Sequence, residues 1–207
     1  MSSEREEFTG IERMGAFCDG VFAIALTLLV LELRVPAADI VGREGLWHAL
    51  GGHWSSYGAF ALSFGIIGIM CANHHSLFRY IGRTNHIFSM LNLGLLFFTV
   101  LLPFPTAVLA TYLPSPEART PATVLYGANL VMTAIFFNLL WRYAIKGRRL
   151  LRAEADQTRV DHVTAEYRLG PILYGAATLL AFVSVWISLG IHALLAAMFL
   201  VPNKARP

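Results

Sequence analysis

Charged residues are scarce in this chain. Only 14% of its 207 residues are Asp, Glu, Lys or Arg, whereas 56% are hydrophobic. A soluble domain of ordinary composition carries about a quarter charged residues. This scarcity excludes a soluble globular protein and predicts an all-α membrane protein whose residues 1–207 form a single domain.

Cysteines are few, no leader is expected, and catalytic motifs are lacking. The two cysteines, Cys18 and Cys71, both fall in hydrophobic segments, so we expect no disulfide framework. Residues 1–7 are acidic and lack the basic stretch that opens a signal peptide, so we expect none. Because no Ser-His-Asp set, phosphate-binding loop or carboxylate pair occurs, we expect no enzyme. The filter sequence of the usual potassium channels is missing too.

Hydrophobic segments dominate what is present. A membrane span needs about 20 apolar residues. Six segments are candidates, and the last of them is short enough to be a tilted or partial span: 14–34, 55–78, 86–110, 121–143, 169–187 and 190–202. Pro103 and Pro105 indicate a helix end and bend in the third. The polar stretch 144–168 is expected to be an amphipathic connection on the cytosolic side.

The basic residues predict the orientation of these spans. If both termini are cytoplasmic, 13 of the 16 basic residues lie inside: Arg5, Arg13, Arg79, Arg83, Arg142, Lys146, Arg148, Arg149, Arg152, Arg159, Arg168, Lys204 and Arg206. Arg34, Arg43 and Arg119 lie outside. This is the bias of membrane proteins toward positive cytosolic loops. It explains the basic pI of about 9.1 without any binding of nucleic acid.

Polar residues occur inside the spans at one shared depth. Counted from the basic anchors, Asp19, His74, His75, Asn92 and Asn138 all fall in the cytosolic third of the membrane. A polar group without a partner is costly in hydrocarbon, so these residues are expected to satisfy one another. We expect Asp19 to pair with a histidine of the second span. Two interpretations stay open: a network that packs helices, or direct handling of protons or ions.

The first span carries a stripe of residues on one helical face. At about 100° per residue, Ile24, Thr27, Leu28 and Leu31 share the face of Arg13, whereas Asp19 points about 120° away from Arg13. The stripe fits a pore lining, and it also fits helix packing or contact with lipid. The run Cys71-Ala-Asn-His74-His75 contains metal-ligand residue types, but adjacent histidines diverge on a helix and no carboxylate stands nearby. We therefore expect no metal site.

The start of the first span carries a recognisable motif. Arg13-x-x-x-Phe17-Cys18-Asp19-Gly20 resembles the Arg-x-x-x-Phe-Ser-Asp signature of the transmembrane protein 175 family, which comprises lysosomal potassium channels and prokaryotic relatives. Further matches are His74-His75-x-x-Phe78, Asn92 and Pro103-Phe-Pro-Thr106, so the resemblance covers most of 11–106. Cys18 replaces the serine of the signature, and Cys71 replaces a tryptophan that usually precedes the histidine pair.

The resemblance implies a fold and a function. One six-helix unit per chain assembles into a homotetramer, and the four first helices surround a central pore. Ile24 corresponds to the narrowest ring, Thr27 to a hydroxyl ring that selects ions, and Leu28 and Leu31 to the continuing hydrophobic wall. The expected function is a potassium-permeable cation channel of the bacterial inner membrane, whose partners are lipid, other copies and monovalent cations and which needs no cofactor besides permeant K⁺.

Two other functions stay open at this point. One is a proton channel or proton-coupled path that uses Asp19 and His74, because some members of the resembled family pass protons. The other is a membrane-embedded binding protein or enzyme with a histidine-based metal site.

Overall fold

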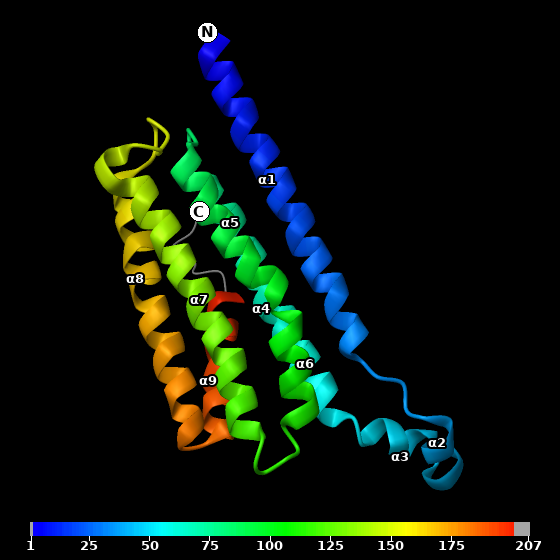
Figure 1. Ribbon diagram of the computed structural model, residues 1–207. Coiled ribbons are helices and arrows are strands. Elements are labelled where there is room, and N and C mark those ends of the chain that lie inside the picture. Colours follow the sequence, from blue (N-terminus) through cyan, green and yellow to red (C-terminus); the bar gives the residue numbers. More distant parts are fainter. Residues whose placement is uncertain (1, 201–207) are drawn as a thin grey trace.

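The computed structural model describes residues 2–200, and these form a bundle of helices with no β-strand (Figure 1). The helices are α1 (Ser2–Leu28), α2 (Ala38–Glu44), α3 (Leu46–Gly51), α4 (Trp54–Phe78), α5 (His86–Leu101), α6 (Pro103–Tyr112), α7 (Arg119–Ile145), α8 (Gln157–Leu179) and α9 (Val185–Leu200). Short 3-10 turns follow α1, α7 and α8 at Leu29–Glu32, Lys146–Arg148 and Leu180–Phe182.

Within residues 2–200, four helical segments are long and apolar enough to cross a membrane. They cover Gly10–Glu32, Trp54–Phe78, His86–Tyr112 and Arg119–Arg148. These ranges lie within five residues of the first four expected spans. The third is divided into α5 and α6 at Pro103, because proline lacks the N–H that would continue the helical hydrogen bonds.

The fifth and sixth segments differ from the expectation. α8 begins at Gln157, inside the stretch expected to be a connection, and ends at Leu179. The chain then turns at 180–184, whereas the expected spans put the break at 188–189, which lie within α9. The turn closes without glycine or proline, because the backbone N–H groups of Val183 and Ser184 both donate to Leu180 O, at 3.0 and 2.8 Å. Residues 201–202 of the expected sixth span lie outside the described residues.

α9 is short for a membrane span. Its 16 residues rise about 24 Å, less than the roughly 30 Å of hydrocarbon in a bilayer. The hydroxyl of Ser184 accepts from the N–H of Ile187 at 3.4 Å, as a helix N-cap does. The expectation of a partial sixth span therefore fits the length of this helix, although its start lies earlier in the chain.

α7 and α8 pack closely because small and polar residues meet between them. A Cβ added to Gly127 of α7 would overlap the side chain of Thr178 of α8. Pro171 within α8 has no N–H for the carbonyl of Tyr167, and Asn138 of α7 donates its amide to that carbonyl at 2.7 Å. Asn138 thus replaces the missing helical hydrogen bond and ties the two helices together.

Buried hydroxyl groups join the other end of the bundle. Ser63 of α4 lies 2.8 Å from the Thr106 hydroxyl of α6 and 3.0 Å from the Tyr126 hydroxyl of α7. All three residues are completely enclosed. Hydrogen bonds of this kind satisfy polar groups where no water reaches, so they hold α4, α6 and α7 in one register.

The pairing of Asn138 with the proline gap predicts a coupled pair of substitutions. Asn138→Ala should lower the free energy of unfolding in detergent by about 1 kcal/mol, because the Tyr167 carbonyl loses its donor. In a Pro171→Ala background the restored N–H of residue 171 takes over, so the same substitution should cost clearly less. The measurement is a thermal-unfolding double-mutant cycle; equal losses in both backgrounds would contradict the assignment.

Candidate functional site

α1 lies along one edge of the bundle and touches it through a narrow seam (Figure 1). The seam consists of Cys18, Phe22 and Ala25 of α1 and of Leu29 in the 3-10 turn that follows it, each no more than 1% exposed. Only 22% of the first spanning segment is buried, against 44–50% for the three others. One side of α1 is therefore packed against its own chain, and the rest of its surface is left uncovered.

The uncovered side of α1 carries the stripe identified in the sequence. Ile24 is 57% exposed, Leu28 37% and Leu31 72%, and Thr27 is exposed beside them. At about 100° per residue, the centre of this stripe lies roughly 150° from the centre of the seam. The sequence-predicted residues are thus brought together on the face that points away from the bundle.

The hydroxyl of Thr27 is anchored to its own helix. It donates to the backbone oxygen of Ile24 at 2.8 Å. Such a bond uses the single O–H donor and leaves the two lone pairs of the oxygen free. The bond therefore fixes the direction of the hydroxyl without removing its capacity to accept a hydrogen bond or to face a cation.

A buried hydrogen-bond set fastens the seam to two other helices. Asn92 of α5 donates its amide to Cys18 Sγ at 3.1 Å and lies 2.9 Å from His74 Nε2 through its amide oxygen. All three side chains are at most 3% exposed. With the amide oxygen as acceptor, the proton of the His74 ring is assigned to Nε2. The centroid of the His74 ring also lies 4.2 Å from the ring centroid of Phe78 and 5.4 Å from that of Phe22.

The expected pairing of Asp19 with a histidine was wrong. Asp19 is exposed, and within residues 2–200 it forms no hydrogen bond or ion pair that joins it to His74 or His75. The neutral amide of Asn92 satisfies His74 instead. Asp19 follows Cys18 by one residue, about 100° further around the helix, so the seam cannot hold both side chains.

The signature motif is thus divided between two directions. Cys18 points into the bundle, whereas Arg13, Phe17, Asp19 and Gly20 are exposed. A Cβ added to Gly20 would meet no atom within 4 Å. Packing within one chain therefore gives no reason for a glycine here, or for charged residues at the mouth of a membrane helix. These features become intelligible if something else covers this face.

His75 and Asn138 also lie apart from the hydrogen-bond set. His75 is exposed at the end of α4, and Asn138 is occupied with the carbonyl of Tyr167. Among the described residues, no group of three His, Cys, Asp or Glu side chains has the spacing of a metal site.

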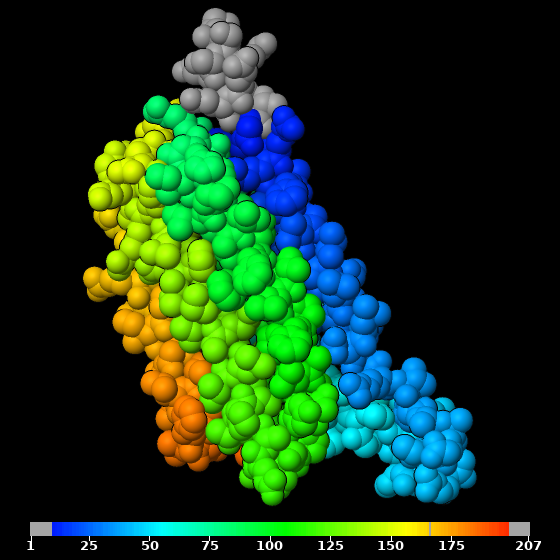
Figure 2. Space-filling model, in the orientation of Figure 1, coloured from blue at the N-terminus to red at the C-terminus, as the bar shows by residue number. Residues whose placement is uncertain are grey.

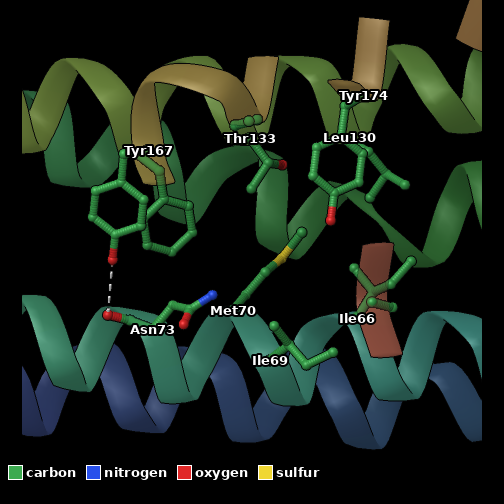
Figure 3. A pocket seen from close by; sticks show the side chains of 12 residues that line it. Ile66, Ile69, Met70, Asn73, Leu130, Thr133, Tyr167 and Tyr174 are labelled. Carbon is green, nitrogen blue, oxygen red and sulfur yellow. Dashed lines mark hydrogen bonds between the residues drawn. The ribbon is translucent and has the colours of Figure 1, made fainter. Parts of the chain in front are cut away.

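A cavity inside the bundle was not foreseen from the sequence. It encloses about 60 Å³ between α4, α7, α8 and α9. Figure 3 shows the amide of Asn73 and the hydroxyl of Tyr174 directed into it from opposite walls, while Tyr167 donates to Asn73 O at 3.4 Å. This volume accommodates a few water molecules, far less than a path across a membrane requires.

His192 is a second buried polar residue that sequence reasoning missed. Its Nδ1 lies 2.8 Å from the carbonyl oxygen of Ser188, and its Nε2 has no hydrogen-bond partner among the described residues. The sequence could have indicated this residue, because a histidine within the apolar run of α9 needs a hydrogen-bond partner inside the membrane.

An apolar groove adjoins α1 on the outside. Phe17 and Val21 of α1 form one wall, and residues of α5 form the other: Leu93, Leu96, Phe97, Val100 and Leu101. Figure 2 shows α1 and α5 side by side on the surface of the molecule. The groove extends the uncovered side of α1 with apolar side chains.

Comparisons with known proteins agree on one family. Residues 13–103 match the family described as "Endosomal/lysosomal potassium channel TMEM175". A protein of Chamaesiphon minutus named as a potassium channel is 46% identical over 98% of this chain and 99% of its own length. The mouse protein named "Endosomal/lysosomal proton channel TMEM175" is 33% identical, but the match covers 83% of this chain and only 35% of that protein.

Solved structures give the same result. The crystal structure of a lysosomal potassium-selective channel TMEM175 homolog from Chamaesiphon minutus superposes with a TM-score of 0.86 and 42% identity, covering 95% of this chain and 99% of that one. A crystal structure of a variant of the potassium channel MtTMEM175 superposes with a TM-score of 0.60 at 20% identity, covering 92% and 86%. The second likeness concerns the fold alone.

The hydrogen-bond set at the seam predicts a large effect of one asparagine. Asn92→Leu should destabilise the protein in detergent by about 1–3 kcal/mol, because the His74 N–H and Cys18 are left buried without a partner. Asn73→Leu is the matched control: the Asn73 side chain has no hydrogen-bond partner among the described residues, so its replacement should cost much less. Thermal unfolding followed by circular dichroism measures both, and similar losses would refute the role of Asn92.

Proposed function

The chain belongs to the family of the endosomal/lysosomal potassium channel TMEM175, and on this premise we propose that it is a potassium-permeable cation channel. Channels, not enzymes, make up this family. The observation that carries the proposal is the uncovered side of α1. It presents an apolar stripe with one hydroxyl, Thr27, directly opposite the seam that fixes the helix.

The uncovered side acquires a function when copies of the chain close a ring. Four copies related by a fourfold axis would place four α1 helices around a central pore. This homotetramer explains why Gly20 and the charged ends of the signature are exposed in a single chain. The groove between α1 and α5 offers an apolar seat for a neighbouring copy at the same interface.

The residues of the stripe have different roles in the proposed pore. Ile24 forms the narrowest ring, and four isoleucines around an axis can close a pore by excluding water. Thr27, one turn further, offers hydroxyl oxygens to a partly dehydrated K⁺, and its bond to Ile24 O holds those oxygens in place. Leu28 and Leu31 continue the hydrophobic wall. Without a fixed charge on the stripe, a cation is not trapped.

The proposed channel resides in the inner membrane of a bacterium. Its termini are cytoplasmic, because 13 of the 16 basic residues then face the cytosol. α8 and α9 are the fifth and sixth helices of the channel unit, in addition to the four segments of spanning length.

A proton path is the second candidate, and the names of the vertebrate relatives favour it. Asp19 is exposed on α1, on a different face from the pore stripe, and could carry a proton, whereas His74 is buried and bonded to Asn92. A proton route through His74 would have to break that hydrogen bond. The potassium reading needs no such rearrangement, so it is preferred.

The decisive experiment is a current measurement on reconstituted protein. In K⁺, Na⁺ and pH gradients the reversal potential should follow K⁺. Ile24→Asn should raise the K⁺ flux about tenfold, which corresponds to a barrier lower by about 1.4 kcal/mol, because water now enters the constriction.

Ile172→Asn is the matched control for the gate. Ile172 is 65% exposed on α8, away from the stripe, so its substitution should leave the flux unchanged. A reversal potential that follows the proton gradient alone would favour the proton channel over the potassium channel. An unaltered flux in correctly assembled Ile24→Asn protein would remove Ile24 from the pore.

Thr27 gives a separate test of ion selection. Thr27→Val keeps the shape and removes the oxygen, so the preference for K⁺ over Na⁺ should fall about tenfold, equivalent to about 1.4 kcal/mol. Thr27→Ser keeps the oxygen and should preserve the preference. If Thr27→Val instead matches wild type in bi-ionic reversal potentials, the hydroxyl serves only the backbone of its own helix.

A further inference from the structure

Two short helices project from the bundle next to the end of α1. The arm, residues 34–53, contains α2 and α3 and connects α1 to α4. In Figure 1 it extends beyond α1, on the side away from the rest of the bundle, and in Figure 2 it forms a separate lobe. Gly45 permits the sharp turn between the two helices, because its φ of +82° is disfavoured for other residues.

The arm exposes large apolar side chains. Val35 is 90% exposed, Trp47 86%, Leu46 50% and Ile40 37%. Its charges cancel, since Arg34 and Arg43 balance Asp39 and Glu44, and Arg43 lies 2.9 Å from Asp39 within α2. A tryptophan and a valine left this bare by their own chain mark a surface that another molecule covers.

The covering molecule is either lipid or a second copy of this chain. Tryptophans often sit at the boundary between membrane and water, where they contact lipid. Trp54 and Trp186 fit that role, because their rings lie 6.0 Å apart on the end of their own bundle. Trp47 differs, since it belongs to α3 of the arm, which extends beyond α1 on the side away from the bundle (Figure 1). There the proposed channel places other copies and not lipid.

We propose that the arm of each copy docks onto the outer end of a neighbouring copy, with Trp47 as its apolar anchor. This inference rests on the proposed function, because it uses the assembly of copies around α1. The contact continues the interface along the α1 stripe to the outer mouth of the pore. Exposed aromatic side chains that enter a partner's surface commonly dominate the affinity of an interface.

Photocrosslinking tests the identity of the partner directly. Benzoylphenylalanine in place of Trp47, in proteoliposomes, should yield an adduct between two protein chains on illumination. The same residue in place of Trp186, which is 53% exposed at the same end of the bundle, should yield mainly lipid adducts. Lipid adducts alone at position 47 would overturn the inference.

A parallel variant separates this inference from the channel assembly itself. Leu31→Cys on the stripe should form disulfides between copies on oxidation, whereas wild type should not, because Cys18 is buried and Cys71 is half-buried. Disulfides at position 31 without protein adducts at position 47 would leave the pore standing and refute the arm. The absence of both would refute the assembly as well.

A pair of matched substitutions measures the strength of the contact. Trp47→Ser should raise about tenfold the concentration at which half of the assembly dissociates in detergent, equivalent to about 1.4 kcal/mol. Trp186→Ser should change it less than twofold, because that side chain stays on its own bundle. Native mass spectrometry over a dilution series measures both, and equal effects of the two substitutions would contradict docking by the arm.

Discussion

The amide of Asn92 is the contact on which the orientation of α1 depends. It donates a hydrogen bond to Cys18 on α1 and accepts one from the ring N–H of His74 on α4. One side chain of α5 thus joins three helices. In the membrane interior none of these groups can turn to water, and losing the arrangement would leave them unpaired. The rotation of α1 about its axis is therefore fixed, although a large part of that helix is not packed against its own chain.

Fixing the rotation also fixes what the opposite side presents. With Cys18 held in the seam, Ile24 and Thr27 must point outward, because a helix turns about 100° per residue. A polar lock inside the bundle thus determines the aim of an apolar stripe outside it. Neither of these two side chains needs a partner elsewhere in the same chain, which suits side chains that would meet only their counterparts in other copies.

The sequence was sufficient for most of the helices and for the stripe, and it failed at particular residues. α4, α5 with α6, and α7 follow apolar runs bounded by proline, glycine or charge, so their positions could be read directly. The turn after α8 has no such signal, and only Ser184 as an N-cap marked it. The pairing of Asp19 with a histidine was wrong because His74 needed only an acceptor, and the neutral oxygen of Asn92 supplied it. Helix angles alone were enough to place the stripe residues on one face, since a single straight helix requires no knowledge of its neighbours.

The bond from Thr27 to Ile24 bears on how a neutral site handles an ion. A hydroxyl that donates its hydrogen to its own backbone can still bind an ion, because a cation interacts with the oxygen lone pairs and not with the hydrogen. Donation to Ile24 O turns the hydrogen toward the helix and leaves the lone pairs outward. The same bond links the hydroxyl to the backbone of Ile24, the residue proposed to form the hydrophobic ring, so the two groups would move as one unit. A constriction and an ion-selecting oxygen can therefore occupy adjacent turns of one helix without a dedicated filter loop.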